Sequence, residues 1–335
     1  MSSGIFIKRL LLALPTLFGV SVIVFVLLRV IPGDPIAMMT PPGASAEDVD
    51  NLRALYGLDK GLFTQYGIWL RELLQGDLGT SISLRQGVGE LILHRLPATL
   101  ELVLLSTLMA TAFCLLLALS GSLYSRSVIG RVVDVIASTA QAVPDFLWGL
   151  LFILFLGVVI PVFPISGRIN PRLDHDLVSQ FYLFESMLRF DGVMMRELLH
   201  HMFLPALALA LPMTGIVTRV LKASLDEVMK QDYIVIARAR GYSRGRILWR
   251  EAMRNALIST IALSGIQLTI LLGGTVLIER LFGYPGIGSM AIGAVIQRDL
   301  PLIQGLILTF AVLFIVINLM VDLLIAWLNP RLQDG

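Results

Sequence analysis

Charged side chains are scarce in this chain of 335 residues: they make up 15% of it, against about a quarter in soluble domains. Hydrophobic residues make up 56% of the chain, and the mean hydropathy is +0.82. These values exclude an ordinary soluble domain and indicate a protein that crosses a membrane several times. The net charge of +2 is too small to favour nucleic acid as a partner.

Residues suited to covalent or metal chemistry are also few. The one cysteine, Cys114, lies in an apolar run, so an intrachain disulfide is excluded and a thiolate metal site is not expected. The four histidines, at positions 94, 175, 200 and 201, lie outside the apolar runs and lack the H-E-x-x-H spacing of a zinc protease. Because no Ser/His or Asp/Asp pair stands out, an intramembrane hydrolase is not favoured.

A nucleotide-binding loop is missing too. The glycine-containing stretch Gly76–Ser81 has no strand before it and no lysine at P-loop spacing, and no Walker-type lysine loop occurs elsewhere. The chain is therefore not expected to hydrolyse ATP. We predict no catalytic, cofactor-binding or metal site within it.

Long apolar runs define the expected fold class, an all-α polytopic membrane protein with six transmembrane helices. The loops 124–131 and 222–257 are rich in basic residues, which places them and both termini in the cytoplasm. Residues 41–97 and 164–203 are then extracytoplasmic. The first apolar run is too long for a signal-peptide core, so we expect it to be a retained helix. The expected helices occupy residues 10–30, 96–123, 132–162, 204–220, 257–278 and 303–328.

The segment between the first two runs is expected to carry two amphipathic helices, lying on the membrane surface or on the helical bundle. Apolar residues recur there at helical spacing in two stripes. One stripe follows an N-cap at Ser45 and the other begins at Phe63. Their members are Val49, Leu52 and Leu55 in the first, and Phe63, Tyr66, Leu70 and Leu73 in the second.

The loop 222–257 is polar, basic and flanked by membrane-spanning runs. Its centre predicts a short helix over Asp232–Gly241, in which the small Ala237 and Ala239 would let another surface approach. Gly241 would provide the left-handed cap that ends this helix. A second helix is expected over Ser243–Ala256, with the serine as N-cap. A loop that only fixes topology would explain the charge but not the pattern of small residues.

This loop resembles the cytoplasmic coupling loop of ABC-importer permeases of the dipeptide, oligopeptide and nickel family. That family carries D-Y-x-x-x-A-R-A-x-G and, about a dozen residues on, R-N-A. Glu251 and Ser259 depart from it, where His and Pro are common. Further resemblances run from residue 31 to residue 331, including I-P-G-D-P at 31–35, P-x-S-G-R at 164–168 and G-G-x-V-x-x-E-x-x-F-x-x-P-G-x-G at 273–288. The coupling-loop matches are Asp232, Tyr233, Ala237, Arg238, Ala239, Gly241, Arg254, Asn255 and Ala256.

The resemblance implies a type I ABC importer (MetI-like) permease fold, divided into 1–31, a periplasmic helical segment at 32–97, and a permease core at 98–335. It implies a non-catalytic subunit of the bacterial inner membrane that forms half of a pathway. The implied partners are a second homologous permease subunit, two ABC ATPase subunits that bind ATP and Mg, a periplasmic substrate-binding protein and the lipid bilayer, with no nucleic acid. The predicted ATPase-coupling residues are Asp232, Tyr233, Ala237, Arg238, Ala239, Arg240 and Gly241.

Peptides of two to several residues are the cargo that the resemblance favours. Nickel chelates, glutathione, opines and haem, which relatives carry, remain open. An ion-coupled secondary transporter is the alternative from another class, with Asp145, Glu279 and Asp322 as candidate acids, but no internal repeat supports it. Such a transporter would also leave the coupling loop unexplained.

Polar residues inside apolar runs normally face protein or water rather than lipid. Pro144 and Asp145 interrupt the third run, which indicates a kink that lines a cavity. Glu279 lies beside Arg280, so an interfacial ion pair and a functional acid both remain open. Glu101, just inside the second run, is favoured as a structural hydrogen-bond acceptor over a substrate contact. The predicted translocation-pathway residues are Asp145, Gln267, Thr275 and Glu279.

Overall fold

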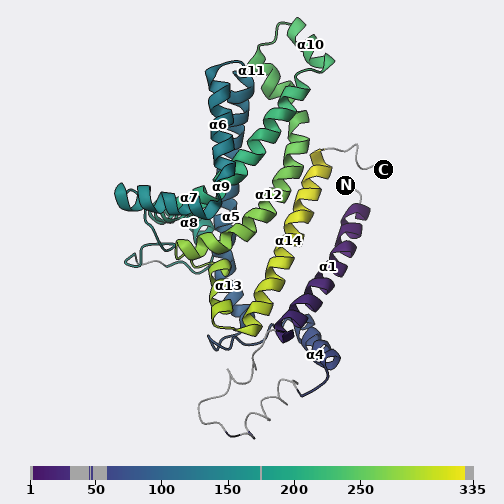
Figure 1. Ribbon diagram of the computed structural model, residues 1–335, viewed down its shortest axis with the longest axis vertical. Coiled ribbons are helices and arrows are strands. Elements are labelled where there is room, and N and C mark those ends of the chain that lie inside the picture. The colour runs from purple at the N-terminus through teal and green to yellow at the C-terminus, as the bar shows by residue number, and fades with distance from the viewer. Residues whose placement is uncertain (1–2, 31–44, 46, 48–58, 174–175, 329–335) are drawn as a thin grey trace. The chain divides into compact units, whose positions relative to one another are not determined.

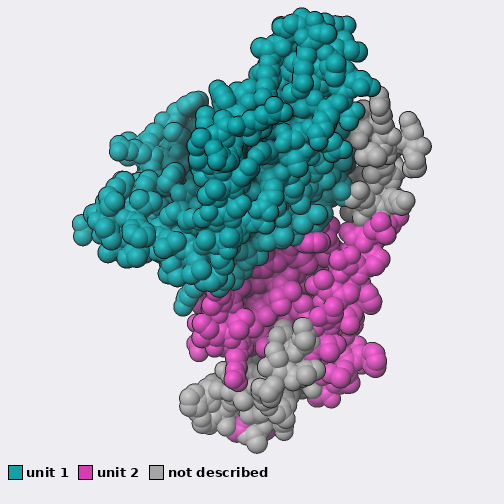
Figure 2. Space-filling view, turned by 45° about the horizontal axis from the view of Figure 1, so that its top comes forward, with its two compact units in different colours: residues 1–3, 97–289, 316–335 teal, residues 4–96, 290–315 magenta. Residues whose placement is uncertain are grey.

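The computed structural model describes the chain except for residues 1–2, 31–44, 46, 48–58, 174–175 and 329–335. Its regular elements within those described residues are helices, joined by turns and one isolated bridge between Thr80 and Gly87 (Figure 1). The chain divides into two compact units (Figure 2). Unit 1 comprises residues 1–3, 97–289 and 316–335, and unit 2 comprises residues 4–96 and 290–315.

Helix α9 (Gly192–Val228) is the central element of unit 1. It is apolar on several sides and packs against α6 (Val128–Ala142), α7 (Asp145–Phe152), α8 (Tyr182–Leu188) and α12 (Met253–Leu281). A helix that is hydrophobic all round must be buried. The fully buried residues along α9 are Leu198, Met202, Leu204, Ala206, Ala208, Ala210, Leu221 and Leu225.

Among the residues that the structure describes, four helices are long and apolar enough to cross a membrane. They are α5 (Val88–Leu123), α9, the continuous stretch Arg244–Leu281 and most of α14 (Leu300–Leu328). The third predicted span is two helical pieces bent by 101°, namely α6 and α7 extended by η1 (Ile153–Val159). The break falls at Pro144, which confirms the predicted interruption. Helix α1 (Ser3–Val30) contains a shorter apolar stretch, Leu11–Val26.

The predicted helix over Ser243–Ala256 was placed correctly at its start and wrongly at its end. Ser243 is the N-cap, and its hydroxyl accepts a hydrogen bond from the Arg246 amide at 3.4 Å. The helix then continues through α11 (Arg244–Arg246) and the π-helical η2 (Ile247–Ala252) into α12 without a break. Nothing at Ala256 stops it, because neither glycine nor proline occurs there.

Within unit 2, α4 (Leu62–Leu74) is the second predicted amphipathic helix, and its existence is confirmed. Tyr66 and Trp69 pack on Phe25 of α1, with ring centroids 5.2 and 5.7 Å away. The Tyr66 and Ser21 hydroxyl groups lie 2.8 Å apart and share a hydrogen bond. Phe63 is 95% exposed, so the packed face is narrower than the predicted stripe. The first predicted stripe lies outside the described residues.

The glycine-containing stretch 76–81 is part of a turn that docks on Asp299, the residue before α14. Gly76 and Gly79 have φ of +85° and +80°, a conformation that favours glycine. The Asp299 carboxylate is buried and accepts hydrogen bonds from the Ser81 hydroxyl at 2.5 Å, the Ser83 amide at 2.9 Å and the Ser83 hydroxyl at 2.6 Å. These glycines therefore serve a structural turn within unit 2.

We expect Asp299→Asn to open this turn, because the amide cannot accept as strongly from three donors. Burial raises the pKa of Asp299, but the hydrogen bonds from Ser81 and Ser83 outweigh it and leave the pKa below its usual range. The folded-state pKa is therefore below the unfolded value of about 3.9, so the stabilisation is present above that pH and disappears as the pH falls through the folded pKa. Hydrogen exchange of residues 80–87 at neutral pH should be about fivefold or more faster in the variant, as expected for a loss of 1–3 kcal/mol. Asp59→Asn, at an exposed site, is the control, and equal exchange in both variants would contradict the prediction.

Candidate functional site

Helix α10 (Asp232–Ala239) confirms the short helix predicted in the loop 222–257. Gly241 has φ of +80°, and its amide donates to the Arg238 carbonyl at 2.9 Å. The next amide, of Tyr242, donates to the Ala237 carbonyl at 3.3 Å. This is the left-handed cap that the sequence predicted. A Cβ at Gly241 would meet nothing within 4 Å, so a side chain there is opposed by backbone conformation rather than by a neighbour.

One face of α10 packs against unit 1 and the other is open. Ile234 is fully buried and Ala237 is 7% exposed. Ala237 therefore packs inward, rather than offering itself to another surface as the sequence suggested, whereas Ala239 is exposed. We call the open face the α10 outer surface; it comprises Tyr233, Val235, Ile236, Ala239 and Arg240.

A hydrogen bond joins the two motifs that the family resemblance singled out. The Asn255 side-chain amide donates to the Tyr233 hydroxyl at 2.7 Å, so the R-N-A motif holds the D-Y motif in place. The Arg238 guanidinium donates to the Met229 carbonyl at 3.3 Å, which closes the loop before α10. The departure at Ser259 is accommodated, because its hydroxyl lies 2.8 Å from that of Ser224 on α9.

Further contacts tie this loop to the ends of α5, α6 and α9. The Arg244 guanidinium donates to the Ser122 carbonyl at 2.7 Å and to the Ser125 hydroxyl at 3.1 Å. Lys222 on α9 forms an ion pair with Asp134 on α6. These contacts therefore join the segments before and after α10 to α5 and α6 of unit 1.

The four predicted pathway residues lie on α7 and α12 at different degrees of burial. Asp145 is half-buried against α12, where a Cβ on Gly274 would overlap its carboxylate. Gln267 is half-buried, and Thr275 is fully buried with its hydroxyl donating to the Leu272 carbonyl at 2.7 Å. The structure brings Asp145 next to the α12 turn that carries Thr275. Their role in a pathway stays a prediction.

Glu279 is fully buried, whereas its neighbour Arg280 is exposed. The Glu279 carboxylate accepts hydrogen bonds from the Thr99 hydroxyl at 2.6 Å and from the Ser289 amide at 2.9 Å. Thr99 in turn accepts from the Ile287 amide at 2.9 Å. A Cβ on Gly286 would overlap the carboxylate, which explains the glycine there. Glu279 thus organises the P-G-x-G turn, and sequence reasoning missed Thr99 as its partner.

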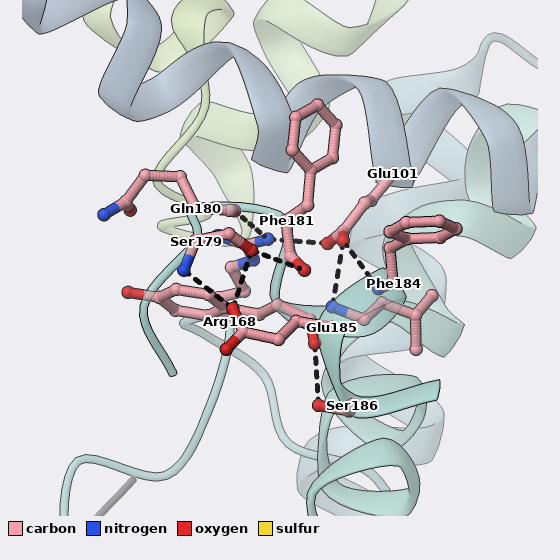
Figure 3. Close-up of polar contacts among 10 residues, drawn as sticks. Glu101, Arg168, Ser179, Gln180, Phe181, Phe184, Glu185 and Ser186 are labelled. Carbon is pink, nitrogen blue, oxygen red and sulfur yellow. Dashed lines mark hydrogen bonds and ion pairs between the residues drawn. The ribbon is translucent and has the colours of Figure 1, made fainter. Parts of the chain in front are cut away.

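Glu101 and Arg168 form a second buried cluster, drawn in Figure 3. An Arg168 nitrogen donates to one Glu101 oxygen at 2.6 Å and to the Gln180 carbonyl at 2.9 Å. The other Glu101 oxygen accepts from the Leu183 and Phe184 amides at the start of α8, at 2.9 and 3.1 Å. Glu101 is therefore a structural hydrogen-bond acceptor, as favoured from the sequence, and Arg168 of the P-x-S-G-R motif is its partner.

These features define a polytopic helical membrane protein with a bent span, buried polar clusters and an exposed helix held outside the spans. Solved structures of the MetNI methionine ABC transporter in inward-facing conformations share this fold. One match has a TM-score of 0.54 at 15% identity, covering 71% of this chain and 96% of the other. Another has a TM-score of 0.53 at 14% identity, covering 69% and 93%. This supports the predicted type I importer fold.

The sequence matches the family model "Binding-protein-dependent transport system inner membrane component" over residues 110–334, and the model of its N-terminal part over residues 3–103. The chain belongs to this family of inner-membrane transport components. It is 37% identical over 97% of both chains to the di/tripeptide permease protein DppB of Pseudomonas aeruginosa. It is 34% identical to the oligopeptide permease protein AppB of Bacillus subtilis and 33% identical to the dipeptide permease protein DppB of Escherichia coli, each over 98% of both chains.

Proposed function

We propose that this chain is the permease subunit of an ATP-driven importer and forms half of the pathway for di- and oligopeptides. The α10 outer surface is the single observation that best supports the coupling role. It lies on a short helix outside the spans and exposes apolar side chains. Asn255 of α12 bonds to Tyr233 of this helix, and Arg244 ties the segment that follows it to α5. The peptide cargo rests on the relatives, which are named as di/tripeptide, dipeptide and oligopeptide permeases.

The proposed complex contains a second homologous permease, two ATPase subunits that bind ATP and Mg, and a periplasmic substrate-binding protein. In it this chain is non-catalytic, and its termini and α10 are cytoplasmic. Nickel chelates, glutathione, opines or haem are the alternative cargoes for the same machinery. Uptake of labelled peptides by the reconstituted complex, with and without ATP, tests this function. Uptake by the purified single chain on an ion gradient alone would instead support a secondary transporter.

The proposed coupling step is mechanical. The α10 outer surface docks in a groove of one ATPase subunit, with Val235 and Ile236 supplying apolar contact and Arg240 pairing with acidic or carbonyl groups. Motion of α10 then reaches α12 through Asn255 and the ends of α5 and α6 through Arg244 and Lys222. Of the four predicted pathway residues, Asp145 and Gln267 are half-buried, and we propose that these two are the ones that contact cargo.

We expect Ile236→Asp and Gly241→Asp to insert normally but to lose transport. Ile236 is 54% exposed, so the first change removes apolar docking area without disturbing unit 1. The second change places a Cβ in a left-handed cap, at a cost of about 1–2 kcal/mol to the end of α10. Peptide uptake and coupled ATP hydrolysis should each fall by about tenfold or more, as expected when one docking contact worth at least 1.4 kcal/mol is lost.

The matched control is Val128→Asp, a similar change at an exposed valine that begins α6, within the other basic segment 124–131. It should retain copurification of the ATPases and wild-type uptake. Ala237→Glu is a poorer test, because Ala237 is buried and its replacement would disturb unit 1 itself. Wild-type uptake by both the Ile236 and Gly241 variants would show that the loop only fixes topology.

A further inference from the structure

An apolar surface is exposed on α8 and on the turn that follows it. Phe190 is 94% exposed and Phe184 is 60% exposed, although neither belongs to a membrane-spanning helix. We call this the α8 apolar surface; it comprises Phe184, Met187, Leu188, Phe190 and Val193. In water this many exposed large apolar side chains in one patch would be unfavourable, so the patch indicates a contact.

The backbone beneath this surface is held in one conformation. Glu185 accepts hydrogen bonds from the Val178 amide at 3.0 Å and from the Ser179 amide and hydroxyl, both at 2.7 Å. These hydrogen bonds, led by the Ser179 hydroxyl, lower the pKa of Glu185 to about 2. Phe190 adopts φ of +54°, which is rare for a bulky residue. The turn therefore exposes the Phe190 side chain at a cost in backbone conformational energy. Exposure of the phenylalanine ring to water would not offset that cost.

The polar groups of this region are used internally. Glu185 and Arg189 form an ion pair, and Arg189 also donates to the Asp176 carbonyl at 3.0 Å. Asp191 accepts hydrogen bonds from the Val193 and Met194 amides and so caps α9. A docking surface for a soluble protein would normally carry a polar rim with groups open to a partner. Here the charges nearest the patch serve the turn instead.

Hydrogen bonds to Glu101 fix the position of α8 along the axis of α5. Glu101 accepts hydrogen bonds from the Leu183 and Phe184 amides in the first turn of α8, so α8 begins at the level of Glu101 (Figure 3). No charged residue follows Glu101 on α5, and the next one in the chain is Arg126, after the helix ends. The part of α5 that follows Glu101, residues 102–123, is about 33 Å long, close to the hydrocarbon core of about 30 Å. Glu101 therefore lies near the boundary between hydrocarbon and headgroups.

We propose that the α8 apolar surface inserts into the lipid bilayer at this boundary, in the leaflet farther from α10. Phospholipid is the occupant that the depth, the apolar character and the internally paired charges favour together. Helix α5 also exposes apolar side chains after Glu101, where Leu104 and Leu108 are 60% and 59% exposed. The insert that carries α8 is then an interfacial membrane anchor of unit 1, with Phe190 as its outermost side chain.

The test places a fluorescent label at Phe190→Cys in the full transporter complex, reconstituted in phosphatidylcholine vesicles. The only native cysteine of this chain, Cys114, is buried, and a complex without the added cysteine gives the background. We expect strong quenching by phospholipids that carry a nitroxide near the glycerol, and little quenching by iodide in the water. Arg172→Cys, at an exposed polar site of the same insert, is the matched control and should show the opposite order.

The quenching pattern distinguishes contact of the α8 apolar surface with lipid from contact with another protein subunit. If nitroxide lipids quench the two labels equally, the proposal is wrong. If instead the Phe190→Cys label resists both quenchers, the surface is covered by another subunit and the proposal is also overturned. A second label at Leu188→Cys repeats the measurement on α8 itself, so that misfolding of one variant cannot decide the result. Vesicle labelling does not depend on transport, so it remains informative even if the proposed function fails.

Discussion

Replacing Arg168 with methionine is expected to destabilise unit 1 by about 3–5 kcal/mol, because it leaves the Glu101 carboxylate buried without its counter-charge. The two side chains are only 5% and 6% exposed, so water cannot take over the role of the guanidinium. The loss should appear as a lower unfolding temperature of the purified complex. It should also appear as faster hydrogen exchange at residues 178–190, whose first helical turn depends on Glu101.

Two further variants show whether loss of the Glu101–Arg168 charge pair causes the destabilisation. Arg189→Met removes an arginine from an ion pair on the same insert, but Arg189 is 45% exposed and its loss should cost about 1 kcal/mol or less. Glu101→Leu combined with Arg168→Met removes both charges, and should recover part of the stability lost in the single variant. If Arg168→Met is no more destabilising than Arg189→Met, the cluster is not a buried charge pair in the membrane.

Local features of the fold could be predicted because the residues that cause them are neighbours in the chain. A proline next to an acid predicted the break at Pro144, since proline removes a helical hydrogen bond wherever it falls. The glycine after the α10 helix predicted its left-handed cap at Gly241. For the same reason, apolar runs of membrane length predicted the four spanning helices found among the described residues.

Which face of a short helix is buried could not be predicted, because that depends on segments far away in the sequence. Ala237 and Ala239 are equally small, but only Ala237 meets unit 1. The partners of the buried acids are similarly remote: Arg168 is 67 residues from Glu101, and Thr99 is 180 residues from Glu279. The sequence identified both acids as unusual, and only the packing of helices shows that each has a structural partner.

Replacing Gly215 is expected to disrupt the packing of α9 against α6 in the core of unit 1. A Cβ at this position of α9 would overlap the Ala137 carbonyl and lie 2.8 Å from the Gln141 amide of α6. Both are backbone atoms, so no side chain can rotate away, and α6 must shift. Such close approach of membrane helices requires a small residue. Because α6 ends just before Pro144, a shift there also displaces the bend that leads into α7.

Gly215→Ala should therefore cost about 1–3 kcal/mol from overpacking, and Gly215→Val more, enough to prevent accumulation of folded complex. The measurement is the yield of monodisperse complex in detergent, together with its unfolding temperature. Gly273→Ala on α12 is the matched control, because a Cβ there meets nothing within 4 Å and alanine favours a helix by about 1 kcal/mol over glycine. The control should keep or raise the unfolding temperature. Equal yields from the Gly215→Val and Gly273→Ala complexes would show that α6 and α9 do not meet backbone to backbone at this glycine.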